Sequence, residues 1–179
     1  MIELRKAEKG SEYRDDLEAI NREAIPECER NSLDDLTDTG AEVLGIFLDG
    51  CPAGFFVLRY YQSICYLAYF AVRRELRSKG IGGRALRKLI EENNRFQMVV
   101  EYESPDAGGA DDMPARRKAF YLRNGFYETG WYTFYDETEF EIACTFPFLE
   151  VEAFNAFTVH LSSLVSDHIP KPYRKDTKG

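Results

Sequence analysis

The chain has 179 residues, a length at which a single globular domain can bury its own hydrophobic core. Hydrophobic residues make up 44% and charged residues 30%, and the formal net charge of -8 repels nucleic-acid phosphates. No apolar run is long enough to span a membrane, and the first residues lack the basic and apolar blocks of a secretory signal. We therefore expect a cytoplasmic protein that binds neither nucleic acid nor membrane.

The cysteines and histidines do not have the spacing of a metal site. The chain has four cysteines and two histidines, which are Cys28, Cys51, Cys65, Cys144, His160 and His168. No two cysteines form a C-x-x-C pair, and no zinc-finger spacing can be built from the six. We expect reduced thiols, mostly buried, and no metal.

The first half of the chain predicts one strand, two helices and three strands. Tyr13, Leu17 and Ile20 recur at helical spacing, and Ser32 with Asp35 forms a loose capping box. A turn at residues 49–52 separates two strands of a hairpin, and the nearly continuous apolar run 64–72 predicts a strand buried on both faces. The predicted ranges are 1–7, 11–24, 32–38, 42–48, 53–61 and 64–72.

The second half predicts a helix, a strand, a helix, two strands and a last helix. The predicted ranges are 79–94, 97–103, 114–124, 126–135, 138–146 and 149–165, with a loop at 104–113. A polar stretch with two prolines follows, and we expect it to fray. The predicted organisation is a single domain over residues 1–165 with a polar C-terminal tail over 166–179, and the element order indicates a mixed sheet flanked by helices.

The most informative stretch follows the strand at 64–72 and opens the next helix. It contains Arg77, Ser78, Lys79, Gly80, Ile81, Gly82 and Gly83, here called the 77–83 segment. Glycines let a backbone approach a ligand closely, and the unpaired N–H groups and the dipole of a helix start attract anions. A glycine-rich turn with solvated basic residues is the alternative interpretation.

Two motifs together resemble a known family. Residues 77–82, Arg-Ser-Lys-Gly-Ile-Gly, resemble the R/Q-x-x-G-x-G/A signature of the GNAT superfamily of acyl-CoA N-acyltransferases. Residues 119–126, Ala-Phe-Tyr-Leu-Arg-Asn-Gly-Phe, resemble its later A-x-x-F/Y-Y-x-x-x-G-F region. The two motifs occur in the expected order, and the element order over residues 1–146 also matches.

The resemblance implies an α+β fold with α/β/α layers. Its sheet is split, mixed and mostly antiparallel, with about seven strands. Acetyl-CoA, as co-substrate, is expected between the strands that end near Val72 and Glu103. The backbone of Phe70, Ala71 and Val72 is expected to pair with the pantetheine arm, and the 77–83 segment to hold the pyrophosphate. Arg117 lies one turn before Tyr121 and either holds a phosphate or is solvated.

The resemblance also implies one catalytic residue, while the base has to be inferred from the residues. Tyr121 matches the family tyrosine that protonates the departing thiolate of CoA. Glu101 and Glu103 lie two apart on one strand and project to one face, so both are candidate bases. We expect Glu103 to lie nearer the cleft. The strand leading to Val72 has no carboxylate, and Tyr69 could assist there through water or simply pack.

Candidate acceptor-binding residues are less specific. Glu27 and Glu29 lie between the first two helices and could bind a cationic amine or belong to a solvated loop. Three aromatic residues of the late hairpin could line the acceptor site or belong to the core. They are Trp131, Tyr132 and Tyr135.

The function that follows is an N-acetyltransferase that moves an acetyl group from acetyl-CoA to a primary amine by direct attack. We expect a small-molecule acceptor rather than a protein. The alternative is a non-catalytic domain that binds or senses acyl-CoA. A third interpretation makes the last helix a dimer seam through Phe154 and Phe157, so the chain is expected to be a monomer or a homodimer.

Overall fold

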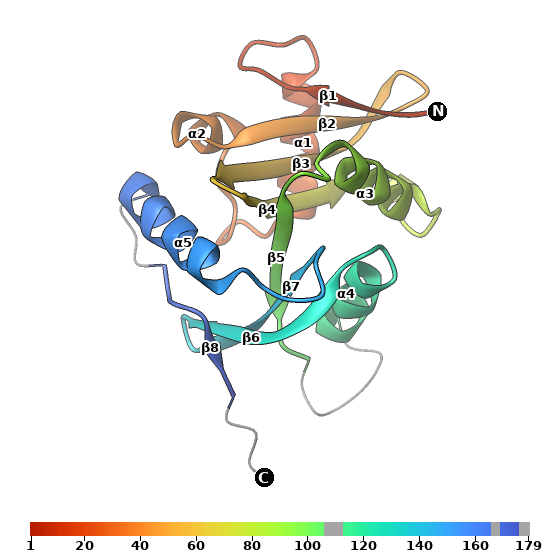
Figure 1. The fold of residues 1–179 in the computed structure, drawn as a ribbon. Helices are drawn as coiled ribbons and strands as arrows, with labels where there is room; N and C mark the ends of the chain where they lie inside the picture. The colour runs from red at the N-terminus through yellow and green to blue at the C-terminus, as the bar shows by residue number, and fades with distance from the viewer. Residues whose placement is uncertain (106–112, 166–168, 176–179) are drawn as a thin grey trace. The chain divides into compact units, whose positions relative to one another are not determined.

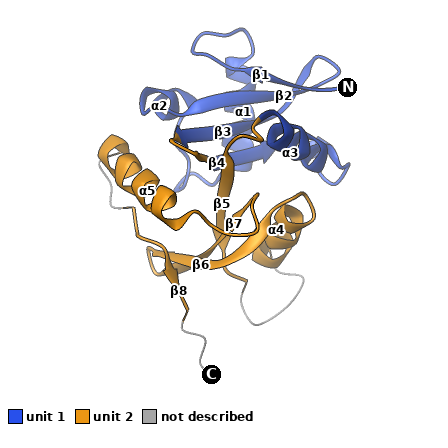
Figure 2. Cartoon of the chain, viewed as in Figure 1, with its two compact units in different colours: residues 1–60, 66–92 blue, residues 61–65, 93–179 orange. Residues whose placement is uncertain are grey.

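The computed structural model describes residues 1–105, 113–165 and 169–175 (Figure 1). Within these residues the chain forms eight strands and five α-helices, and it divides into two compact units (Figure 2). Unit 1 comprises residues 1–60 and 66–92, and unit 2 comprises residues 61–65 and 93–179. The fold class is α+β, as the sequence predicted.

Unit 1 contains a sheet portion with the strand order β1-β2-β3-β4. Its elements are β1 (Ile2–Lys6), α1 (Arg14–Ala24), α2 (Leu33–Asp38), β2 (Glu42–Leu48), β3 (Cys51–Tyr61), β4 (Ile64–Val72), a 3-10 turn (Arg74–Leu76) and α3 (Ile81–Glu92). The predicted cap of α2 is confirmed, because the backbone N–H of Asp35 donates to Oγ of Ser32 at 3.0 Å.

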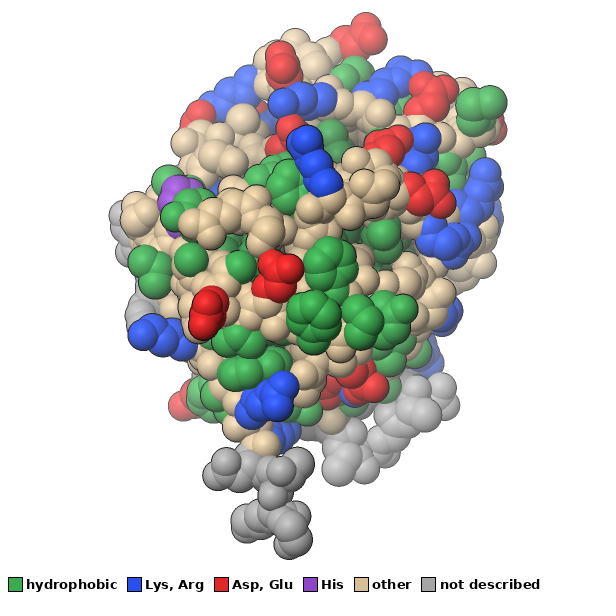
Figure 3. Space-filling model, viewed as in Figure 1, with side chains coloured by type: hydrophobic (Ala, Val, Ile, Leu, Met, Phe, Trp, Pro, Cys, Tyr) green, Lys and Arg blue, Asp and Glu red, His purple; other side chains and the backbone are tan. Residues whose placement is uncertain are grey.

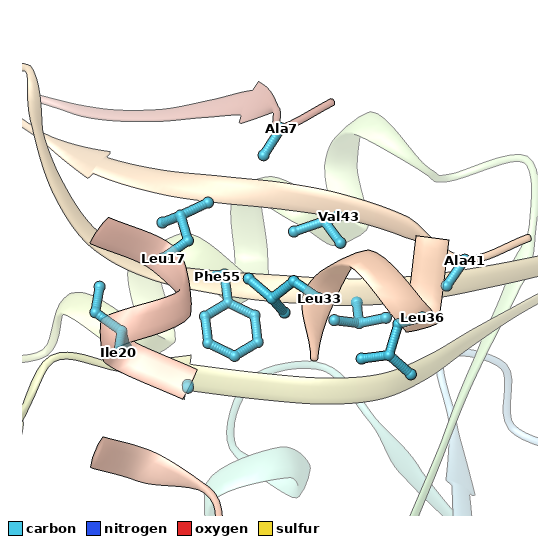
Figure 4. Packing of buried hydrophobic residues seen from close by; sticks show 10 residues of the cluster. Ala7, Leu17, Ile20, Leu33, Leu36, Ala41, Val43 and Phe55 are labelled. Atoms are coloured by element: carbon cyan, nitrogen blue, oxygen red, sulfur yellow. The ribbon is translucent and has the colours of Figure 1, made fainter. Parts of the chain in front are cut away.

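The helices of unit 1 cover the sheet portion on both faces. Leu17 and Ile20 of α1 and Leu33 of α2 pack onto Val43 and Phe55 of the strands (Figure 4). Helix α3 lies on the other face, where it contacts β1 and buries four apolar side chains (Figure 1). These are Ile81, Ala85, Leu86 and Leu89.

The strand that is buried on both faces is β3, not β4. Seven consecutive residues of β3, from 53 to 59, are buried. The prediction for 64–72 is wrong, because Tyr66, Tyr69 and Phe70 of β4 are only half-buried. A tyrosine presents an apolar ring and a polar hydroxyl, so an apolar run that contains tyrosines tolerates partial exposure.

Unit 2 contains strands in the order β5-β7-β6-β8, in which β7 pairs with β5 and β6, and β8 pairs with β6, all antiparallel. Its elements are β5 (Gln97–Glu103), α4 (Met113–Leu122), β6 (Tyr127–Tyr135), β7 (Thr138–Cys144), α5 (Val151–Val165) and β8 (Tyr173–Arg174). The predicted loop over 104–113 lies mostly outside the described residues.

The C-terminal segment adds an eighth strand to the about seven that the sequence predicted. Tyr173 and Arg174 pair with Tyr132 and Trp131 of β6 and form an eighth strand. The hydroxyl of Tyr173 donates to Glu139 at 2.7 Å, and the pair fixes the short strand. Composition did not reveal this strand, because its polar and proline-rich surroundings are typical of a tail.

Helix α5 begins at a polar junction with β5. The side chain of Gln97 is 1% exposed; its Nε2 donates to the carbonyl of Phe148 at 2.8 Å, and its Oε1 accepts from the N–H of Glu150 at 2.9 Å. Further along α5, Phe154 is 0% and Phe157 is 2% exposed, so neither is available as a dimer seam.

Candidate functional site

The 77–83 segment of unit 1 connects β4 to α3 through a turn with two left-handed residues. Ser78 has a φ of 61° and Gly80 a φ of 74°, a conformation that glycine adopts freely and serine at a cost. Residues 77–80 are exposed, and Ile81 is buried where α3 begins. The turn therefore presents its backbone to solvent next to the first turn of a helix.

Neighbouring groups hold this turn in place. Nε of Arg77 donates to the carbonyl of Val72 at 2.9 Å, so this side chain also fixes the end of β4. The backbone N–H of Arg74 donates to a carboxylate oxygen of Glu23 on α1 at 3.0 Å. A turn that is ordered before ligand binding loses less conformational entropy when a ligand binds.

The start of α3 has the electrostatic character of an anion site. The helix has 12 residues and no acidic residue in its first turn, and Lys79 is exposed just before it. The N-terminal N–H groups and the helix dipole favour negative charge at such a position. The residues present therefore fit a pyrophosphate.

The end of β4 lies unusually close to β3. A Cβ atom added at Gly54 would lie 2.3 Å from the carbonyl oxygen of Ala71, so only glycine fits there without a shift of the backbone. The next residue continues the contact, because the N–H of Arg73 donates to the carbonyl of Ala53 at 2.8 Å. The sequence does not single out Gly54, because a single glycine inside a strand does not reveal which backbone approaches it.

The three residues expected to pair with pantetheine lie at this end of β4. The ring of Phe70 stacks on Phe56, with ring centroids 4.6 Å apart. The carbonyl of Ala71 points toward Gly54, and the carbonyl of Val72 accepts from Arg77. Pairing of this backbone with pantetheine stays a prediction.

In unit 2, Tyr121 of α4 is a buried tyrosine among aromatic rings. It is 7% exposed and lies parallel to Tyr102 of β5, with centroids 5.8 Å apart and planes 9° apart. Phe120 and Phe126 meet the Tyr121 ring edge-on. Burial raises the pKa of Tyr121 to about 12, although the charge of Arg117 acts in the opposite direction. The hydroxyl therefore keeps its proton at physiological pH.

The side chain of Arg117 is exposed, which is compatible both with a phosphate contact and with solvation. Its neighbour Lys118 has a different environment, which the sequence did not reveal. Nζ of Lys118 lies 2.7 Å from Glu141 on β7 and 2.5 Å from Glu128 on β6. Burial alone would lower the pKa of Lys118, but these two bonds raise it. The cluster ties α4 to the hairpin of β6 and β7.

The two candidate bases of β5 have different environments. Alternation along the strand puts Glu101 and Glu103 on the face opposite to Tyr102, which is the residue that contacts Tyr121. Glu101 is half-buried and accepts a hydrogen bond from the hydroxyl of Thr133 on β6. Glu103 is exposed. Within unit 2, a protonated acid and two carboxylates therefore lie on opposite faces of one strand.

The acceptor candidates of unit 1 form a surface network. The hydroxyl of Tyr69 donates to the carbonyl of Glu29 at 2.9 Å and accepts from the amide of Asn31 at 3.2 Å. Tyr69 thus holds the loop between α1 and α2. The side chains of Glu27 and Glu29 are exposed in this loop.

The aromatic residues of the hairpin meet the C-terminal segment in unit 2. The guanidinium of Arg174 lies 4.9 Å from the ring centre of Trp131, and Nζ of Lys175 lies 4.4 Å from that of Tyr132. Tyr135 is 45% exposed. Trp131 and Tyr132 are half-buried, and the role of all three residues in acceptor binding stays a prediction.

The thiols differ in exposure. Cys65 and Cys144 are buried, whereas Cys28 and Cys51 are exposed, so the expectation of mostly buried thiols holds for half of them. Burial raises the pKa of Cys144 to about 11, so it stays protonated. Across the described ranges, no three His, Cys, Asp or Glu side chains are arranged to hold a metal ion. No helix in the described part of the chain is long and apolar enough to cross a membrane.

Comparison with known proteins agrees with this geometry. The model of the acetyltransferase (GNAT) family matches residues 5–126, which is more than half of the chain. No curated protein sequence matches the chain. A structure described as a GNAT-family acetyltransferase from Bacteroides thetaiotaomicron has a TM-score of 0.74 and 23% identity, covering 93% of this chain and 99% of its own.

Two further solved structures share the fold. The ribosomal-protein-S18-alanine N-acetyltransferase of Escherichia coli has a TM-score of 0.62 and 16% identity, covering 83% of this chain and 96% of its own. A GNAT family acetyltransferase from Elizabethkingia anophelis, solved with acetyl-CoA bound, has a TM-score of 0.57 and 19% identity, covering 80% of this chain and 96% of its own.

The fold and the paired motifs define an acyltransferase of the CoA-dependent class. The chain belongs to the GNAT acetyltransferase family, and it is an acetyl-CoA-dependent acyltransferase.

Proposed function

We propose that this acetyltransferase transfers the acetyl group of acetyl-CoA directly to the primary amine of a small molecule. The observation that carries the proposal is the arrangement of unit 2. A buried Tyr121, whose pKa of about 12 keeps it protonated, stacks on Tyr102 of β5, and Glu101 of the same strand is a half-buried carboxylate. Direct transfer needs a base for the amine and an acid for the leaving thiolate.

The 77–83 segment is the proposed site of the pyrophosphate. The exposed backbone of the turn, the start of α3 and Lys79 supply N–H donors and positive charge. Phe70, Ala71 and Val72 are proposed to bind the pantetheine arm through their backbone. The thioester supplies the activated acetyl group, and the chain's own residues bind it and move protons.

The proton transfers follow from the side chains. A carboxylate, for which Glu101 is the better-supported candidate, takes a proton from the ammonium form of the acceptor. The neutral nitrogen attacks the thioester carbonyl, and the bond between carbon and sulfur breaks. As the bond to sulfur breaks, the hydroxyl of Tyr121 gives its proton to the departing sulfur. The attacking nitrogen then loses its second proton to solvent, which leaves a neutral amide, and the phenolate of Tyr121 is reprotonated from solvent. Protonation matters here because a thiolate that leaves into a water-poor site is costly.

Local carboxylates, rather than an overall field, support an amine acceptor. Both signs of charge are interspersed on the face shown in Figure 3, so no single field covers that face. The exposed carboxylates of Glu27 and Glu29 lie in the loop that Tyr69 holds, and they suit a cationic amine.

The experiment is thiol release from acetyl-CoA against a panel of small amines, amino acids and peptides. Acetyl-CoA binding is measured in parallel by thermal shift. We expect stabilisation by acetyl-CoA and thiol release with one class of small amine. Release with peptides alone would overturn the small-molecule part, and stabilisation with no turnover would favour a binding domain. No stabilisation at saturating acetyl-CoA would contradict the proposed use of this co-substrate.

A further inference from the structure

Glu101 and Thr133 interact across an intervening strand. In the order β5-β7-β6, Glu101 lies opposite Ile142 of β7, and Thr133 of β6 lies opposite Phe140 of β7. Glu101 therefore reaches past β7, diagonally, to accept from the hydroxyl of Thr133. Because β7 separates β5 from β6, a side chain of one strand must be long to reach a side chain of the other, and the side chain of glutamate is long enough.

The hydroxyl of Thr133 is buried and donates to the carboxylate of Glu101. Thr133 is 3% exposed, while Glu101 is half-buried. A hydroxyl that donates to a carboxylate forms a charge-assisted bond, which is stronger than a bond between neutral groups. The bond favours the ionised carboxylate, which is the form that a general base needs. Glu103, two residues away, is exposed.

We propose that Thr133 is a positioning residue for Glu101: its hydroxyl keeps the carboxylate ionised and aimed, and so makes Glu101 rather than Glu103 the base. The inference rests on the proposed function. In the step concerned, a proton passes from the acceptor's ammonium group to the Glu101 carboxylate, which leaves a neutral amine and a carboxylic acid. The carboxylic acid later returns this proton to solvent.

The strand residues next to Glu101 and Thr133 on their face of the sheet include three apolar side chains. Alternation places Phe140 and Ile142 of β7 and Trp131 of β6 on the face of Glu101, and none of these three titrates. The charged side chains from this face of the described strands are Glu103 on β5 itself and Arg174 of β8, which lies over Trp131. The Lys118 cluster belongs to the opposite face, because it holds Glu141, which pairs with Tyr102.

The test compares Thr133→Val, which removes the hydroxyl but keeps the shape, with Thr133→Ser, which keeps the hydroxyl. Thr158→Val is the matched control, since Thr158 is also 3% exposed but its hydroxyl donates to a backbone carbonyl, that of Asn155. Thermal unfolding checks that each variant is folded.

The first readout is the side-chain carboxyl signal of Glu101 in carbon-13 NMR, titrated with pH and assigned by its loss in Glu101→Gln. We expect Thr133→Val to move this titration to higher pH, and Thr133→Ser and Thr158→Val to leave it near the wild-type position. An unchanged titration in Thr133→Val would overturn the proposal, whether or not an acceptor is known.

The second readout is the pH profile of kcat/KM with the acceptor found in the panel. Thr133→Val should lower the value roughly tenfold on the acid side and much less at high pH, because a lost bond to a charged group is worth about that factor. The KM for acetyl-CoA should stay unchanged. An equal loss at every pH, or no rescue by serine, would contradict a positioning role. Wild-type protein without any turnover would count against the proposed function. The NMR titration would still show whether the Thr133 hydroxyl affects the ionisation of Glu101.

Discussion

The 77–83 segment and the faces of β5 are two parts of the molecule that are built in different ways. The 77–83 segment is a run of consecutive residues, exposed at the turn, that would bind through backbone groups. The β5 region assembles Glu101, Tyr121 and Thr133 from three successive elements, β5, α4 and β6, whose side chains meet only in the fold. A backbone site of consecutive residues can be recognised from the sequence, whereas a site of side chains depends on strand register and helix packing.

The 77–83 segment and the β5 region also differ in exposure to solvent. Residues 77–80 are exposed, as an anion from solvent requires, and Tyr121 is buried, as an acid that must keep its proton requires. This contrast suggests that changes in the 77–83 segment act mainly on binding, and that changes in the β5 region act mainly on turnover.

The largest expected effect separates the two carboxylates of β5. Glu101→Gln should lower kcat by about 10²–10⁴-fold, which is the range for loss of a general base. Glu103→Gln should change kcat only a few-fold, because Glu103 is exposed. Steady-state kinetics with both variants shows which carboxylate is the base, and a larger loss of kcat in Glu103→Gln would assign that role to Glu103.

A substitution at Gly54 tests whether close approach of two strands shapes the end of β4. Gly54→Ala should lower the free energy of unfolding by about 1–3 kcal/mol, because the added Cβ meets backbone at Ala71. Gly45→Ala is the control; its Cβ would meet the ring of Phe47 at 2.7 Å, and a side chain can move more easily. Urea unfolding measures both, and an equal cost would show that the backbone contact is not limiting.

A substitution at Gly80 probes the turn of the 77–83 segment. Gly80→Ala should raise the KM for acetyl-CoA by roughly 5–30-fold, because a left-handed conformation costs alanine about 1–2 kcal/mol and the turn will relax away from it. Gly10→Ala carries a similar strain, with a φ of 76° and open space around the position. It should lower stability without changing this KM. A change in KM with both variants would point to general destabilisation.

The smallest expected effect is the lack of an alkaline limb from Tyr121. Burial raises its pKa to about 12, so the proton-donating form persists as the pH rises through the ordinary tyrosine range near 10. We expect kcat to show no fall due to Tyr121 between about pH 8 and pH 10. An alkaline limb in the wild type that disappears in Tyr121→Phe would contradict this assignment.

Local signals predicted most elements of the fold. The range 97–103 is reproduced by β5, and Ser32 caps α2 as expected, because both depend on neighbouring residues. Long-range features could not be predicted. The pairing of β8 with β6 needs a partner about 40 residues away, and the partial exposure of β4 depends on what covers the strand in the fold.

In the candidate site, too, local features could be predicted from the sequence and long-range features could not. Both motifs lie where the sequence predicted, at the start of α3 and on α4. The environments of Glu101 and Glu103 were not predictable, since alternation shows that two side chains share a face but not which one meets a donor. Thr133 and Lys118 gave no local signal, because their partners lie on other strands.

The most direct test of the account is Tyr121→Phe, measured for kcat and for the Kd of acetyl-CoA on the same preparation. We expect kcat to fall by about 10²-fold or more while Kd changes less than about threefold, because the hydroxyl acts on the leaving thiolate rather than in binding. Equal losses in both quantities, or an unchanged kcat, would contradict the role of Tyr121 as the acid.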